Sequence, residues 1–219
     1  MTTMDREVKK CAVCGSKHEY TVIASTNSFG APDLDLRPPE MERSTMSLWV
    51  QECPDCGYVA SNITNKPGKV TKEWLASQAF VTCDGIRFRS GLASRFYKQY
   101  KISLLNTKTE QAFCAIHHAA WACDDRRDVK KAMICRDLAI PLIEKLIEEK
   151  HENAENFLLM KADLLRRAGH FERVAAEYSD MVFENDTMDK VRLFQLKKAA
   201  EKDMGCYTVQ DALDSFGAH

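Results

Sequence analysis

Four cysteines near the N-terminus are arranged in two pairs whose spacing suits metal binding. The pairs lie in the segments CAVCG (residues 11–15) and CPDCG (residues 53–57). A two-residue spacing lets a tight turn aim both thiolates at one ion, and zinc takes four such ligands in a tetrahedron. The glycine after each second cysteine permits the positive φ that the chain needs to leave the turn. The sequence therefore predicts one Zn²⁺ ion bound by Cys11, Cys14, Cys53 and Cys56.

Four protein ligands leave no open position for a catalytic water, so the predicted role of this zinc is structural. The same knuckles also resemble rubredoxin, in which four cysteine sulfurs hold iron and carry one electron. Iron is therefore an alternative, although few aromatic residues surround the knuckles. A redox dithiol is less favoured, because neither pair opens a helix after a buried strand.

The hydrophobic pattern divides the chain into two predicted domains. Residues 1–65 contain strand-like segments at 19–25 and 46–51 and are expected to form a zinc-ribbon-like domain. Residues 66–219 show the helical period, with helices expected at 70–81, 90–105, 107–123, 127–151, 156–168, 171–184 and 188–203. Pro141 should kink or interrupt the fourth of these. The predicted fold is mainly α, with a small β zinc ribbon followed by antiparallel helical hairpins.

One predicted hairpin, residues 162–182, resembles a tetratricopeptide repeat. Ala168 and Gly169 supply the small residues of a tight helix turn, and Phe171 and Tyr178 supply large aromatic side chains for the second helix. Val174 stands where the repeat usually has alanine, and no second repeat aligns equally well. We therefore expect a tetratricopeptide-like helical domain, with an unrelated helical bundle as the alternative.

The segment between the two knuckles carries more charge than a simple connection needs. Asp33, Asp35, Arg37 and Arg43 lie in it among several prolines. Because binding residues are often found on loops, these four residues are a candidate recognition loop. The alternative is a solvated loop that its prolines hold extended.

Residues 66–106 are basic, with eight Lys and Arg against two Asp and Glu. Aromatic residues alternate here with a candidate basic patch, which is a pattern that binds phosphates and stacks bases. The patch consists of Arg87, Arg89, Arg95, Lys98 and Lys101. The alternative is that the aromatics face inward and that the basic residues meet acidic parts of the same chain.

The remaining candidates for chemistry are weaker. Cys114 and His118 share a helical face and offer a possible second metal site, but the apolar stripe on the same helix favours core packing. The chain contains no phosphate-binding glycine loop, no HExxH and no GxSxG, so no enzymatic activity is indicated. No apolar run approaches the roughly 18 residues of a membrane span, and the expected location is the cytoplasm.

Taken together, the knuckles and the helical remainder resemble an uncharacterised bacterial family, classed as a domain of unknown function. Its members place two CxxCG knuckles, the second as CPxCGY followed by alanine, before a tetratricopeptide-like region. Here the second knuckle is CPDCGYVA, with Val59 before the alanine. The resemblance implies zinc binding in a bacterial cytosol. The predicted function is a non-enzymatic zinc-binding scaffold that recognises a protein or peptide, with a nucleic-acid-associated regulator as the alternative.

Overall fold

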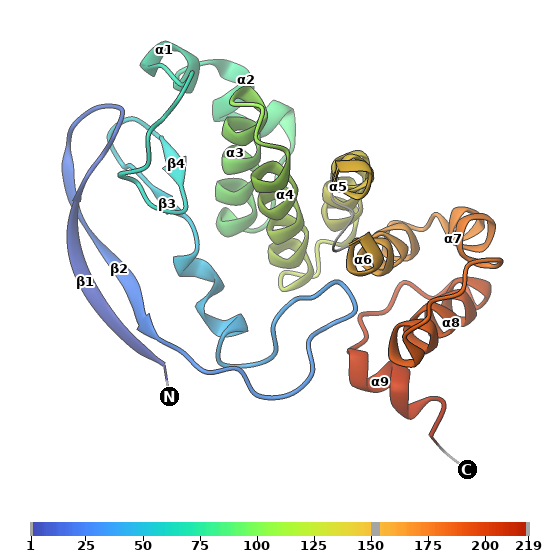
Figure 1. Cartoon of the computed structure of the whole chain (residues 1–219). Helices are drawn as coiled ribbons and strands as arrows, with labels where there is room; N and C mark the ends of the chain where they lie inside the picture. The colour runs from blue at the N-terminus through green and yellow to red at the C-terminus, as the bar shows by residue number, and fades with distance from the viewer. Residues whose placement is uncertain (1, 150–153, 218–219) are drawn as a thin grey trace. The chain divides into compact units, whose positions relative to one another are not determined.

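The structure, a computed structural model, describes residues 2–149 and 154–217 (Figure 1). The chain divides into two compact units. The first contains Met1–Ser28 and Glu40–Ala132, and the second contains Phe29–Pro39 and Met133–His219. This division differs from the predicted boundary after residue 65, because it groups the cysteine knuckles with the helices that directly follow them.

The first unit begins with two β-hairpins. Strands β1 (Thr3–Lys10) and β2 (Lys17–Ser25) pair antiparallel along their whole length, and the shorter strands β3 (Gln51–Glu52) and β4 (Val59–Ala60) form the second hairpin. The expected strand at 19–25 is confirmed as part of β2. Strand β1 was missed, because its mostly exposed, charged residues give no alternating apolar pattern.

The expected strand at 46–51 is wrong over most of its length. Residues Arg43–Leu48 form the 3-10 helix η1, and only Gln51–Glu52 is extended. The Thr45 hydroxyl donates to Glu42 O and accepts from Trp49 Nε1, which holds this turn in helical form. Met46 is buried, so tertiary packing also stabilises the 3-10 conformation. The β propensity of the segment does not reveal this packing.

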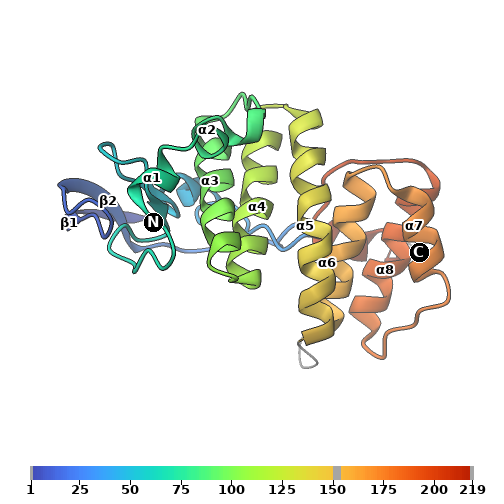
Figure 2. The same cartoon turned by 90° about the horizontal axis from the view of Figure 1, so that it is seen from above.

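The helices of the first unit are α1 (Lys72–Leu75), α2 (Gln78–Val81), α3 (Gly91–Leu105) and α4 (Thr109–Asp124), with a short 3-10 turn, η2 (Cys83–Gly85), before α3. The single helix expected at 70–81 is broken, because the Ser77 hydroxyl accepts from Phe80 N and starts a new helix. Helices α3 and α4 lie side by side as an antiparallel pair (Figure 2). Phe96 and Ile116 are fully buried in this unit.

The second unit contains α5 (Val129–Glu149), whose first turn belongs to the first unit, α6 (Ala154–Arg167), α7 (Phe171–Tyr178), α8 (Asp186–Ala200) and α9 (Val209–Asp214). Helix α5 continues through Pro141, so this residue does not interrupt it. The mainly α fold with a small β ribbon is therefore confirmed. Within the described residues, no helix is both long and apolar enough to cross a membrane.

The turn between α6 and α7 has the structure that its sequence suggested. Gly169 has a φ of 86°, Gly169 N donates to Arg166 O, and His170 N donates to Leu165 O. These two bonds form a Schellman motif, in which a left-handed residue ends the helix. Tyr178 is buried and its hydroxyl donates to Leu158 O at 2.7 Å, which ties α7 to α6. The helical hairpin is present, whereas its relation to tetratricopeptide repeats stays a prediction.

Candidate metal centre

Each cysteine pair occupies the turn of one β-hairpin, and the two turns have the same backbone geometry. In the first, Gly15 N donates to Cys11 O at 3.0 Å, and in the second, Gly57 N donates to Cys53 O at 2.9 Å. The two glycines have φ values of 80° and 71°, in the region that side chains disfavour. The same short-range hydrogen bond and glycine conformation therefore form both knuckles, and each knuckle directs two sulfurs to the same side.

The four sulfurs converge on one point. The distance from Cys11 Sγ to Cys56 Sγ is 3.7 Å, and that from Cys14 Sγ to Cys53 Sγ is 3.6 Å. All four lie within 4.8 Å of one another. A tetrahedron with metal–sulfur bonds of about 2.3 Å has edges of about 3.8 Å, so this donor set fits a tetrathiolate metal ion. The predicted grouping of Cys11, Cys14, Cys53 and Cys56 is thus present in space.

Ser16 supports the sulfurs from the first hairpin. Its hydroxyl lies 2.9 Å from Cys14 Sγ and 3.4 Å from Cys53 Sγ. Hydrogen bonding by this hydroxyl lowers the pKa of the Cys14 thiol to about 6, whereas burial raises the pKa of Cys11. A hydroxyl in this position favours the thiolate that a metal needs. Ser16 is not among the residues predicted from the sequence, although its place directly after a CxxCG segment is a usable signal.

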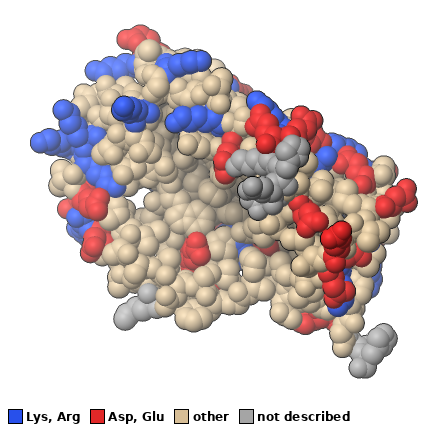
Figure 3. Space-filling view, in the orientation of Figure 1, with Lys and Arg blue, Asp and Glu red and all other residues tan. Residues whose placement is uncertain are grey.

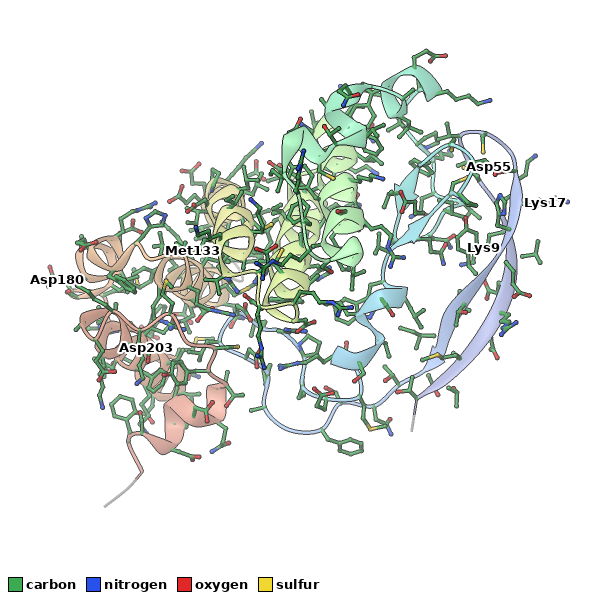
Figure 4. The ribbon with its side chains drawn as sticks, turned by 180° about the vertical axis from the view of Figure 1, so that it is seen from behind. Lys9, Lys17, Asp55, Met133, Asp180 and Asp203 are labelled. Atoms are coloured by element: carbon green, nitrogen blue, oxygen red, sulfur yellow. The ribbon has the colours of Figure 1, made fainter. Side chains whose placement is uncertain are left out.

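His18 and Asp55 join the two hairpins beside the sulfurs. His18 Nε2 lies 3.0 Å from Asp55 Oδ2, and this pair together with Cys53 forms a second group of potential ligands. Because this second group shares Cys53 with the tetrathiolate group, we assign it to the edge of the same metal centre and not to a separate site. Figure 4 shows Asp55, which lies in the turn of the second hairpin, near Lys9 and Lys17 of the first hairpin. Lys9 pairs with Glu7, so charge at this end is partly balanced within the chain.

The candidate recognition loop is largely buried in the second unit. Asp33, Asp35 and Arg37 are 2%, 0% and 7% exposed, which differs from the solvated loop that the sequence suggested. Asp35 Oδ2 lies 3.0 Å from Arg167 Nη1, and the Cys206 thiol donates to Asp33 Oδ2. These partners allow the carboxylates to be buried, and they lie more than 130 residues away in sequence. Arg43 belongs to η1 of the first unit and is half-buried.

The candidate basic patch is divided between exposed and paired residues. Arg87 and Arg89 are exposed and Arg95 is half-buried. Lys98 pairs with Glu52 at 2.7 Å, and Lys101 pairs with Asp84 at 2.8 Å. In Figure 3, Lys and Arg side chains gather over α1 and the knuckle end of the β1–β2 hairpin.

The aromatics between these basic residues face inward, as the alternative interpretation expected. Phe96 and Tyr100 are 0% and 7% exposed. Burying these rings leaves the charged side chains on the outer side of α3, where Lys98 and Lys101 meet carboxylates of their own chain. The basic segment is therefore partly neutralised within the first unit.

The Cys114 and His118 pair is not part of any metal-binding group among the described residues. His118 packs instead against Trp49 and Phe96, with ring centroids 5.2 and 5.1 Å apart. His117 is 2% exposed and contacts Trp121. These contacts agree with the core interpretation of this helix.

Comparisons with known proteins give no match to a protein family, a curated protein or a solved structure. The resemblance to an uncharacterised bacterial family therefore rests on the knuckle and helix motifs alone.

Proposed function

We propose that this protein is a non-enzymatic, zinc-stabilised scaffold that recognises another macromolecule, most favourably a protein or peptide, in a bacterial cytoplasm. The observation that carries the proposal is the convergence of four sulfurs from two hairpin turns, with distances of 3.6 and 3.7 Å between paired atoms. Zinc is preferred to iron because thiolate-only sites of this form most often hold zinc in structural modules.

The metal acts through stability in this proposal. An isolated two-stranded hairpin is at best marginally stable in water, and most β1 residues are exposed. A bound ion links the turn at Cys11 to the turn at Cys53 and supplies the free energy that the small hairpins lack. All four positions belong to protein, so the ion has no site for substrate and the recognition surface lies elsewhere.

A nucleic-acid-associated regulator is the second candidate, because Arg87 and Arg89 are exposed and form no ion pair within the described residues. Such a protein binds with an affinity that falls steeply as salt rises. A gel shift on single-stranded and double-stranded probes at low and high salt tests this candidate. Absence of a shift at low salt removes it.

The test of the proposed function begins with the metal content of the untagged protein and of two variants. Wild type and Cys114→Ser, which alters an exposed thiol outside the metal centre, should each contain one zinc per chain. Cys53→Ser should lose the zinc and unfold at a lower temperature. Visible absorbance with bound iron would contradict the zinc assignment.

Recognition is tested by chemical cross-linking in a lysate of the source organism, with and without nuclease. A discrete nuclease-resistant protein adduct that Cys53→Ser fails to form supports the scaffold. Adducts that disappear with nuclease support the second candidate instead.

A further inference from the structure

A cavity of about 810 Å³ lies within the first unit, between the segment after the second knuckle and the α3–α4 hairpin. This volume is within the range of roughly 300–1,000 Å³ that is typical of ligand sites. Tyr58, Val59 and Ala60 form one wall, and they directly follow Gly57, the last residue of the second knuckle. The metal centre therefore fixes the segment that shapes the cavity.

The floor of the cavity is apolar and aromatic. Trp49 and His118 contact each other edge to face, and Ile102 and Ala115 lie beside them. The indole N–H of Trp49 is already bonded to Thr45 Oγ1 at 2.9 Å. Trp49 is half-buried and lines the cavity, so the accessible part of its ring suits a hydrophobic or aromatic side chain of a ligand.

Polar groups without partners surround this floor. Gln99 and Gln111 line the cavity, and their carboxamides form no hydrogen bond with any described residue. Lys66 and Lys108 also line it, are exposed, and form no ion pair in the described part of the chain. Carboxamides both donate and accept hydrogen bonds, as the peptide group does, and ammonium groups attract carboxylates.

We propose that this cavity binds an extended segment of another protein that carries acidic side chains around an apolar one. The apolar side chain contacts Trp49, the backbone amides of the segment bond with Gln99 and Gln111, and its carboxylates pair with Lys66 and Lys108. This inference rests on the proposed function, since it gives the scaffold its recognition site and the chemistry of its partner.

A peptide fits the cavity better than a nucleic acid strand does. Binding of a strand requires a series of cations along its phosphates. The cavity has two lysines, Lys66 and Lys108, which are too few to follow the phosphates of a strand. Two lysines match one or two acidic side chains, and neutral carboxamides match a peptide backbone.

The experiment measures fluorescence anisotropy of three labelled octapeptides, in which leucine alternates with glutamate, glutamine or lysine. The full-length zinc-loaded protein should bind the glutamate peptide most tightly and the lysine peptide least. The double variant Lys66→Glu and Lys108→Glu should weaken binding of the glutamate peptide at least about tenfold, since both attractions become repulsions. Gln111→Ala should weaken it about threefold by removing a hydrogen bond.

Lys130→Glu is the matched control, because Lys130 is an exposed lysine that does not line the cavity. It should change the affinity less than twofold. The inference is overturned if the control loses as much affinity for the glutamate peptide as the cavity variant does, or if unlabelled oligothymidylate displaces the peptide. It is also overturned if no peptide binding appears at a protein concentration of about 1 mM. Zinc content, measured on the same samples, separates the two ideas: loaded protein without peptide binding refutes only the cavity, and protein that holds no zinc refutes the scaffold.

Discussion

Replacing Asp35 with alanine should strongly destabilise the second unit, although its sequence context resembles a surface loop. The Asp35 side chain is fully buried, and its partner Arg167 is 6% exposed at a separation of 3.0 Å. Removing one member of a buried ion pair leaves the other charge uncompensated, at a cost of about 3–5 kcal/mol. Asp163 lies 3.7 Å from the same guanidinium and compensates in part, so the expected loss is near the lower limit, about 3 kcal/mol.

The assay combines chemical denaturation with limited chymotrypsin digestion, which cleaves after Leu34 only when residues 29–39 detach. Wild type should resist cleavage there, since Leu34 is 3% exposed. The double variant Asp35→Ala and Arg167→Met should recover at least about 1 kcal/mol relative to Asp35→Ala alone, because no lone charge remains buried. A loss below about 1 kcal/mol in Asp35→Ala, with unchanged digestion, would refute the reasoning.

Three further predictions concern the metal centre and the helices. Ser16→Ala should weaken zinc binding about tenfold in a chelator competition, because Cys14 loses its hydroxyl partner. Gly57→Ala should lower the free energy of unfolding by about 1 kcal/mol, since the added Cβ meets no atom but a φ of 71° is strained for alanine. Burial raises the pKa of Glu144, but hydrogen bonds from Lys161 and a neighbouring arginine lower it more, so its pKa lies below the usual 4.5. The resulting stability is present above pH 4.5 and is lost as pH falls through the lower pKa of Glu144 in the folded state. Lys161→Met should therefore reduce the fall in Tm at acid pH.

Each of these predictions has a matched control in the same unit. Ser44→Ala removes a hydroxyl that bonds with Glu40, and should leave zinc affinity unchanged. Gly91→Ala adds a Cβ in open space without a positive φ, and should not destabilise the protein. Lys145→Met removes an exposed ion pair of 3.7 Å, and should leave the acid decline as in wild type. Equal effects in a variant and its control would contradict the corresponding prediction.

Local rules within the sequence determined the metal centre and the longer helices. Two CxxCG segments fix their own turns through short-range hydrogen bonds and glycine geometry, so the knuckles form as predicted. The helix expected at 90–105 is present as Gly91–Leu105, with Ser90 as its cap. In these cases the residues that decide the structure are neighbours in the chain.

Tertiary structure decided what the intervening segment and the basic residues do. Asp35 is buried because Arg167, 132 residues later, neutralises its charge, and no local sequence pattern predicts that partner. Lys98 likewise pairs with Glu52, which lies in another element, so its charge is less available to a ligand. The cavity around Trp49 exists because segments far apart in sequence meet. A single sequence gives the period and the turn chemistry of each element, whereas burial and charge pairing depend on which distant elements pack together.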